Sequence, residues 1–235
     1  MARPTAILYV DGFNLYRRCL ERYPELKWVD LLALAQNLMP YADVVAVHYF
    51  TALIRPGTSL DRQKPQRQQV YLRAIATQAP RVQVHLGKFR VDPREMVRHP
   101  LVLDPGTGEP ARVRVRKIEE KGSDVNLAGR VISDAHLGRA DLYVLLTNDS
   151  DQAGTLRIVR DDAGGVTGLV LPMETARGSK ELMHAGPGFV GFVTRPLLEA
   201  SQLPDVLRDE VGSIRRPGTW SRTSEDPGTS GAGVL

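Results

Sequence analysis

The sequence predicts an α/β protein with a doubly wound, mainly parallel central sheet and helices on both faces. Apolar runs at residues 5–10 and 141–146 have the length of buried strands, and each ends at a polar turn. Segments with helical spacing separate runs of this kind, and strands that alternate with helices indicate parallel pairing. With 235 residues, 42% of them hydrophobic, the chain is long enough to bury roughly 70% of its unfolded surface.

Local signals set the other expected elements. Residues 26–38 repeat apolar side chains at helical spacing and stop before Pro40, which favours a helix. Asp61 is placed to cap a helix that runs to residue 78, and Ser123 or Asp124 opens a helix that runs to residue 137. The remaining expected segments are strands 44–53, 82–89, 112–118, 166–171 and 189–193, and a helical turn at 179–184.

Two regions break this alternation. Prolines and glycines between residues 90 and 112 exclude a long helix, so a hairpin-like excursion is expected over about residues 90–118. From Gly212 the chain is rich in Gly, Pro, Ser and Thr and has almost nothing to bury, so residues 212–235 are expected to be a disordered tail. The sequence therefore predicts a single domain over residues 1–211.

Positive charge is concentrated in one part of the chain. The formal net charge is +4, yet residues 62–130 hold 15 Lys or Arg against 7 Asp or Glu, so the remainder is net negative. Arg112, Arg114 and Arg116 alternate along one expected strand and share one face, a geometry that can follow a phosphate backbone. The same face is nearly as typical of an edge strand that charge protects against aggregation.

Composition also excludes several classes of protein. No apolar run reaches the ~18–20 residues that cross a bilayer, and the first residues lack the apolar core of a signal peptide. Cys19 is the only cysteine, so neither an intrachain disulfide nor a Cys-rich zinc site is available. We expect a cytoplasmic protein that does not contact a membrane.

Carboxylates mark three turns that the expected topology brings together. Asp11 and Asp149 each follow an apolar strand, and the carboxyl ends of parallel strands line the ligand crevice of an open sheet. Asp151 lies in the same turn as Asp149, and Asp124 opens the helix after the cationic strand. Four carboxylates without basic partners repel one another, and a bound Mg²⁺ or Mn²⁺ relieves this repulsion. The pattern therefore predicts a metal site.

Each of these aspartates also has a purely structural interpretation. Asp11 before Gly12 fits a turn, Asp124 fits a helix cap, and Asp149 with Asp151 fits the capped start of the next helix. For any single position the two interpretations are about equally good. Their occurrence at three element ends along one expected edge favours a site.

Three segments carry a resemblance to a known family: YVDGFNLY around Asp11, EKGSDV around Asp124, and LLTNDSD around Asp149. In this order they resemble the signature blocks of NYN-domain proteins of the PIN-like nuclease superfamily, with the LabA-like branch most similar, over about residues 5–195. The sequence departs from the family pattern at Asn148 and Gln152, where a Gly and an aromatic residue are usual, and at Gly186, where an Asp is usual.

The resemblance implies a PIN-like sheet and a metal-dependent endoribonuclease that hydrolyses phosphodiester bonds in single-stranded or structured RNA. It implies metal-binding roles for the four aspartates, with Asp11 and Asp149 as the primary ligands of Mg²⁺ or Mn²⁺. The ion would lower the pKa of a bound water. The expected catalytic residues are Asp11, Asn14, Asp124, Asp149 and Asp151.

Asn14 matches the family's polar residue beside the first aspartate, and Lys121 matches the basic residue before Asp124. Lys121, Arg112, Arg114 and Arg116 are the expected nucleic-acid-binding residues. The sequence does not separate RNA from single-stranded DNA. It does not fix the oligomeric state either, and a homo-oligomer stays open.

Two alternatives remain at this stage. A non-catalytic RNA-binding or regulatory module is one, although clustered carboxylates give no advantage to a protein that only binds polyanions. A phosphatase of the haloacid-dehalogenase type is the other, because its first strand also ends in an Asp. That chemistry needs a second Asp two positions later, where this chain has Phe13. A toprim-like site would use Asp149 and Asp151 but expects a Glu in place of Asp11.

Overall fold

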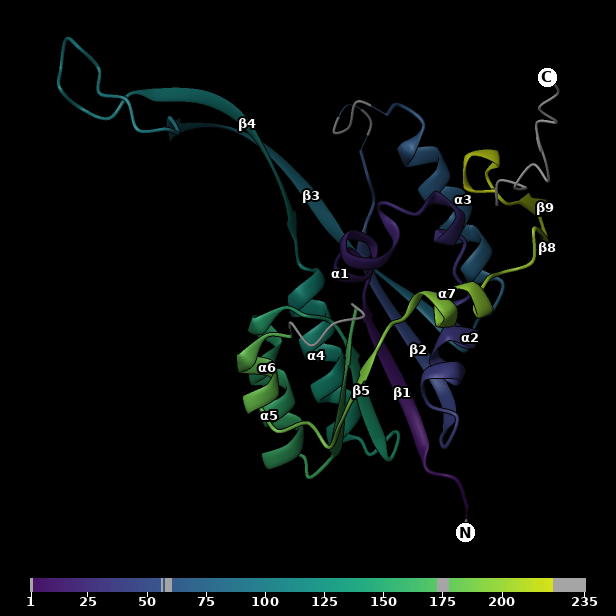
Figure 1. The fold of residues 1–235 in the computed structure, drawn as a ribbon. Helices are drawn as coiled ribbons and strands as arrows, with labels where there is room; N and C mark the ends of the chain where they lie inside the picture. The colour runs from purple at the N-terminus through teal and green to yellow at the C-terminus, as the bar shows by residue number, and fades with distance from the viewer. Residues whose placement is uncertain (1, 56, 58–60, 173–177, 222–235) are drawn as a thin grey trace, which may run out of the picture.

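The structure is a computed structural model that describes residues 2–55, 57, 61–172 and 178–221. Within these ranges the chain folds around a seven-stranded sheet of order β4-β3-β2-β1-β5-β6-β7 (Figure 1). Neighbouring strands pair in parallel, except that β3 and β4 pair antiparallel. The strands are β1 Thr5–Asp11, β2 Asp43–Ala52, β3 Val82–Val97, β4 Arg112–Lys121, β5 Leu142–Leu146, β6 Val166–Leu171 and β7 Phe189–Phe192.

Helices cover both faces of this sheet, as the alternating sequence pattern predicts. Residues of α2, α3 and α7 contribute to the buried cluster on one face, and residues of α4, α5 and α6 to the cluster on the other (Figure 1). In the described ranges, no helix combines the length and the apolar character needed to cross a bilayer. The helices are α1 Gly12–Leu15, α2 Leu31–Leu38, α3 Lys64–Ala76, α4 Ser123–His136, α5 Ala153–Asp161, α6 Lys180–His184 and α7 Arg195–Ala200, with shorter turns η1 Tyr16–Leu20, η2 Pro24–Leu26, η3 Ser150–Gln152 and η4 Gly218–Trp220.

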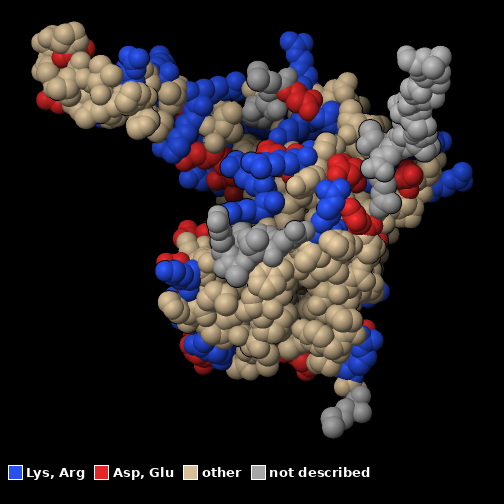
Figure 2. Space-filling model, in the orientation of Figure 1, with Lys and Arg blue, Asp and Glu red and all other residues tan. Residues whose placement is uncertain are grey.

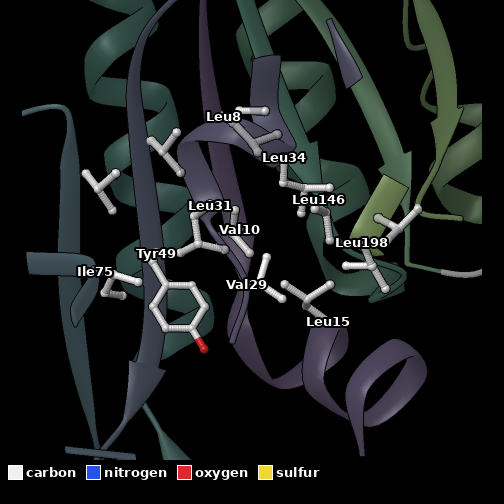
Figure 3. Close-up of a cluster of buried hydrophobic side chains, with 14 of the residues drawn as sticks. Leu8, Val10, Leu15, Val29, Leu31, Leu34, Tyr49, Ile75, Leu146 and Leu198 are labelled. Carbon is white, nitrogen blue, oxygen red and sulfur yellow. The ribbon is translucent and has the colours of Figure 1, made fainter. Parts of the chain in front are cut away.

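The central strand β1 is buried on both sides. Leu8 and Val10 belong to the cluster that includes α2, and Tyr9 belongs to the cluster that includes α4 and α5. Figure 3 shows Leu8 and Val10 among the leucines and valines of the first cluster. Because successive side chains of a strand point to opposite faces, a strand covered on both sides is apolar at every position. This explains the unbroken apolar run at residues 5–10.

The order of the strands places a topological switch point between β1 and β5. From β1 the chain moves outward to β2 and then β3, and it later returns to the other side of β1 to form β5. In open α/β sheets, ligands bind at the carboxyl ends of the strands beside such a point. β1 ends at Asp11, and β5 ends at Leu146, just before Thr147. The sheet therefore brings the two predicted acidic turns to one edge, which we call the rim.

The predicted helix at residues 26–38 is wrong at its start. Residues 24–26 form a short 3-10 turn, and α2 begins at Leu31, because the Asp30 carboxylate accepts a hydrogen bond from the backbone N–H of Ala33 at 2.9 Å and caps the helix. Val29 pairs instead with Gln202 in an isolated β-bridge. The apolar spacing before Asp30 reflects burial of an extended segment.

The excursion predicted between residues 90 and 118 is a long two-stranded arm. β3 pairs with β2 over Val82–Gly87 and then with β4 over Lys88–Val97, so its second half leaves the sheet as part of a hairpin. Figure 1 shows this hairpin projecting from the body. β3 therefore extends eight residues beyond the predicted end at residue 89. Pro93 is tolerated in the arm because the outer edge of β3 is unpaired there.

The predicted start of the disordered tail is also wrong. Gly212–Arg215 form β9, which pairs with β8, Val206–Asp209, and Ile214 is buried. Trp220 lies 6.3 Å from Trp28, measured between ring centroids, and 6.4 Å from Tyr71. The ordered chain therefore continues to at least residue 221, and residues 222–235 lie outside the described part.

Ile214→Ala provides a test of this correction. Its side chain is 2% exposed, so the substitution should leave a cavity and lower the free energy of unfolding by about 2 kcal/mol or more. Val211→Ala is the matched control, because Val211 is 84% exposed and its substitution should change stability by less than about 0.5 kcal/mol. Chemical denaturation measures both changes. Equal stability of the two variants would mean that the segment after Val211 does not pack on the domain.

Candidate functional site

The first acidic turn of the rim depends on a glycine. Asp11 is the last residue of β1 and the N-cap of α1, where its side chain accepts a hydrogen bond from the backbone N–H of Asn14 at 3.0 Å. A Cβ at Gly12 would lie 2.6 Å from the carbonyl oxygen of Phe50 and 2.8 Å from the Tyr49 ring. Only glycine lets the chain turn from strand to helix this close to β2. The turn therefore fixes the Asp11 carboxylate at the rim.

Asp11 is buried and held by neighbouring side chains. The Asn14 amide nitrogen donates to its Oδ2 at 2.7 Å, and the Thr147 hydroxyl donates to the same oxygen at 2.9 Å. The Asn14 Oδ1 accepts the backbone N–H of Asn148 at 3.3 Å, so Asn14 joins the ends of β1 and β5. Sequence reasoning placed Asn14 correctly beside Asp11 but missed Thr147. The signal for Thr147 was available, because it directly follows the apolar run of β5.

The turn after β5 is held in the same way. The Asp149 Oδ1 accepts the backbone N–H of Asp151 at 3.1 Å, and the backbone N–H of Asp149 donates to the Thr147 hydroxyl at 3.1 Å. The Asn148 Oδ1 accepts the backbone N–H of Ser179 at 2.8 Å, which ties α6 to the rim. Asp149 therefore does cap the following turn, as the structural interpretation predicted.

Asp124 approaches the rim from α4. Gly122 precedes this helix with a φ of +99°, a conformation that favours glycine, and the Glu120 carboxylate caps the helix by accepting from the Ser123 N–H at 3.1 Å and hydroxyl at 2.7 Å. The Gln152 side chain donates to the Asp124 backbone carbonyl at 3.3 Å, which joins α4 to the turn after β5. Asp124 therefore lies in the first turn of the helix rather than at its cap.

The carboxylates are close enough to change the protonation of Asp124. Partial burial raises the pKa of Asp124, and the negative charges of Asp11, Asp149, Glu120 and Asp151 raise it further, to about 6. The structure thus brings the four predicted aspartates together electrostatically, and it adds Glu120 to them. At neutral pH, Asp124 gains and loses a proton more readily than an ordinary surface aspartate.

The arrangement does not provide the predicted metal site. In the part of the chain that the structure describes, no three His, Cys, Asp or Glu side chains are placed to hold a metal ion. The physical reason lies in the hydrogen bonds above. Asp11 directs its oxygens at Asn14 and Thr147, and Asp149 directs one at the backbone of Asp151. Hydrogen-bond donors of the chain itself thus stabilise the carboxylates that a dication was expected to bind.

The three predicted arginines lie on the arm, and Lys121 lies at its base, where β4 leads into α4. Arg112, Arg114 and Arg116 are exposed along β4, and Lys121 ends that strand next to Gly122. The Arg116 guanidinium donates to the carbonyl of Gly57 at 3.1 Å, and Lys121 lies 3.8 Å from Glu119. Figure 2 shows Lys and Arg side chains gathered along the shaft of the arm, with few at its tip.

A separate polar cluster lies between the sheet and α4. Asp134 accepts hydrogen bonds from the Tyr9 hydroxyl at 3.0 Å and from Arg130 at 2.8 Å, and the His48 and His85 rings contact each other at 2.9 Å between Nδ1 and Nε2. Burial lowers the pKa of His48 to about 4, with a further contribution from Arg130, so His48 is neutral at pH 7. His48 is buried and His85 is partly buried, and neither belongs to the rim.

Comparison with known proteins finds similarity to a curated enzyme and to a solved structure. No family model matches the chain. The 6-hydroxy-3-succinoylpyridine 3-monooxygenase HspA of Pseudomonas putida is 29% identical over 237 residues, which cover 91% of this chain and 74% of that protein. A crystal structure of a Vibrio parahaemolyticus protein of unknown function matches with a TM-score of 0.50 and 16% identity, covering 86% of this chain and 97% of that one. At this identity the second match shows a shared fold alone.

The similarity to a monooxygenase overturns the activity predicted from the motifs. An oxidoreductase that aligns with 91% of the chain contradicts the endoribonuclease prediction. It also goes against the two alternatives, the phosphatase and the non-catalytic RNA-binding module. The predicted Mg²⁺ or Mn²⁺ cofactor is contradicted as well, by the relative and by the lack of a suitable ligand group in the described ranges. The motif-based prediction failed because short acidic blocks describe where carboxylates lie and not what they act on.

The raised pKa of Asp124 predicts how stability depends on pH. The folded-state pKa of about 6 lies above the ordinary value of 3.8, so the folded protein binds this proton more tightly than the unfolded chain does. The proton on Asp124 therefore stabilises the folded protein fully below about pH 4, and this stabilisation is lost as the pH rises to about 6. Asp124→Asn removes the titratable carboxyl group, and with it the loss of stability at rising pH. The free energy of unfolding of the variant minus that of the wild type should therefore rise between about pH 4 and pH 7.

Chemical denaturation at several pH values measures this difference. Asp162→Asn is the control, because Asp162 is exposed at the C-terminal end of α5 and its substitution leaves the carboxylates of the rim unchanged. Parallel stability curves for wild type and Asp124→Asn would contradict a carboxylate crowded by its neighbours.

Proposed function

We propose that the protein is an oxidoreductase of the monooxygenase type that acts on a small hydroxylated aromatic acid. The observation that carries the proposal is the 29% identity to a monooxygenase over 91% of this chain. The name of that relative describes a pyridine ring with a hydroxyl group and a succinoyl group as its substrate. A substrate of the same class, planar, hydroxylated and negatively charged, is the simplest one to propose here.

The overall reaction sets what the protein must bind. A monooxygenase inserts one oxygen atom of O₂ into the substrate and reduces the other to water, which takes two electrons and two protons. The electron donor is of the reduced nicotinamide class. The part that this chain's own residues can perform is proton transfer, because a ring hydroxyl that loses its proton makes the aromatic ring more reactive toward oxygen.

Asp124 is the residue proposed to take that proton. Its pKa of about 6 is close to neutral, which suits a general base at physiological pH. Asp11 is a positioning residue, because its charge helps to raise that pKa and its own oxygens are held by Asn14 and Thr147. Asn14 is a positioning residue for Asp11, and the charges of Asp149 and Asp151 help to raise the pKa of Asp124.

A dinucleotide cofactor does not fit the place that it usually occupies in this type of fold. In dinucleotide-binding folds the pyrophosphate lies at the helix N-terminus after the first strand, approached by a glycine-rich turn. In this chain the Asp11 carboxylate already caps that helix, and Asp124, Asp149 and Asp151 add further negative charge. The rim repels a pyrophosphate, so a dinucleotide does not fit at this position.

Incorporation of labelled oxygen tests the proposal. The purified protein is incubated with 6-hydroxy-3-succinoylpyridine, NADH, added flavin and ¹⁸O₂, and the products are analysed by mass spectrometry. One ¹⁸O atom per product molecule is expected, with NADH consumed in proportion. Asp124→Asn should lower kcat by ~10²-fold or more.

Asp162→Asn, which removes an exposed carboxylate elsewhere, should retain the activity. A parallel incubation contains single-stranded RNA with Mn²⁺ and no pyridine. Lack of ¹⁸O incorporation would overturn the proposed monooxygenase activity, and cleavage of that RNA would in addition contradict the assignment to the oxidoreductases. Full activity of Asp124→Asn would remove Asp124 from the mechanism.

Other expectations from the sequence stay as proposals. The positions of Asp11, Asp124 and Asp149 at the ends of β1 and β5 and the start of α4 support a PIN-like arrangement of the NYN type as a statement about fold alone. A cytoplasmic location also stays a proposal, based on the composition of the sequence. The oligomeric state stays open.

Binding of RNA by the arm is a separate prediction, independent of the activity. The three arginines of β4 are exposed on one strand, which suits contacts with a phosphate backbone. Arg112, Arg114 and Arg116 changed together to Gln should weaken RNA binding and flatten its dependence on salt, because fewer counterions are released. Binding isotherms at several salt concentrations measure the slope, and an unchanged slope would show that this strand does not contact RNA.

A further inference from the structure

A pocket of about 460 Å³ opens beside the rim. Its wall includes Gly12 and Phe13, which belong to the same turn as Asp11, so the pocket and the carboxylates adjoin. The other walls come from η1, β2, α3, the arm and η4, which are far apart in the sequence. None of the predicted site residues lines this pocket, although Gly12, Phe13 and Tyr16 of the YVDGFNLY segment do.

Aromatic rings form much of the wall. Phe13 and Phe89 meet edge to face with centroids 5.6 Å apart, and Tyr71 meets Tyr49 at 6.3 Å and Trp220 at 6.4 Å, both nearly at right angles. Rings from α1, β2, α3, the arm and η4 therefore border one space. Flat rings held at right angles to one another offer faces and edges on which a further planar ring can pack.

Positive charge gathers at one part of this wall. The ammonium groups of Lys27 and Lys64 lie 5.4 Å and 5.1 Å from the centroid of the Tyr16 ring. Burial lowers the pKa of Lys27, and the nearby charges of Lys64 and Arg67 lower it further, whereas Glu21 and Asp61, which also line the pocket, act in the opposite direction. Among the described residues no carboxylate lies within ion-pair distance, 4.0 Å, of either lysine, whereas Arg67 pairs with Asp61. The two lysines repel each other, and a bound anion would relieve that repulsion.

The basic side chains that line the pocket outnumber the acidic ones, with Arg17, Lys27, Lys64 and Arg67 against Glu21 and Asp61, and the rim carboxylates lie beyond its wall. The carboxylates of the rim repel an anionic group, and the lysines attract one. A ring with a negative substituent would therefore place that substituent toward Lys27 and Lys64 and its other edge toward the turn that carries Asp11. The pocket recognises charge at one end and leaves the ring between the aromatic walls.

From the lysine pair and the aromatic walls we infer that this pocket binds a planar aromatic anion. The inference deepens the proposed function and rests on it for the role of the ligand. Two sources share this chemistry, an aromatic carboxylate substrate and a phosphate-bearing flavin mononucleotide. Both carry a flat ring and a negative group, which in the flavin is joined to the ring through the ribityl chain, and the experiment distinguishes them.

Binding is measured without O₂ or an electron donor, by calorimetry with the full chain. The probes are 6-hydroxynicotinate with its neutral amide as the control, and flavin mononucleotide with neutral riboflavin as the control. Within the pair that belongs to the true source, the anion should bind about tenfold or more tightly than the neutral compound. Lys27→Gln combined with Lys64→Gln should abolish that preference, and Lys180→Gln on α6 should keep it.

Circular dichroism verifies that each variant is folded. Equal affinity for anion and neutral compound in both pairs, or an unchanged preference in the folded double variant, would overturn the inference. The outcome is separable from that of the proposed function. Anion-selective binding without ¹⁸O incorporation keeps the pocket and rejects the monooxygenase, whereas turnover with an unchanged anion preference in the folded double variant keeps the monooxygenase and rejects the pocket.

Discussion

The crowding of carboxylates at the switch point of the sheet is the constraint on which the site depends. Two parallel strands deliver Asp11 and Asp149 to one edge, and α4 brings Asp124 to them. The fold accommodates this charge with its own donors, because Asn14 and Thr147 hold Asp11. The repulsion that remains appears at Asp124 as a raised pKa. A cluster that resembles a metal site when carboxylates are counted is thus a hydrogen-bonded network that favours one extra proton.

The same turn joins this acidic network to a pocket of the opposite charge. Gly12 and Phe13 line the pocket directly after Asp11, and Lys27 and Lys64 lie over the Tyr16 ring in its wall. A rim that rejects pyrophosphate and a neighbouring pocket that favours an aromatic anion together suit a small charged ring better than a polymer lying across the sheet edge. This agrees with the similarity to an enzyme named for a pyridine substrate.

Sequence reasoning succeeded where the signal was local and failed where distant contacts decided. Buried strands such as β1 were found almost to the residue, because a strand covered on both faces is apolar throughout. The start of α2 was missed because the cap at Asp30 overrides the apolar spacing before it. The order of residues 212–221 was missed because Ile214 and Trp220 pack against residues, including Trp28 and Tyr71, that lie more than 140 positions away.

The sequence by itself determined the α/β class, the strand runs, and the place of Asp11, Asp124 and Asp149 at element ends, since these follow from periodicity and turn chemistry. Only the tertiary structure decided which groups the carboxylates contact, because their hydrogen-bond partners are set by how β1, β5 and α4 meet. It also decided that an aromatic, lysine-bearing pocket exists, since five segments far apart in the chain must come together to form it. The electrostatic surroundings and the burial of a residue depend on its neighbours in space, and the order of residues along the chain does not contain them.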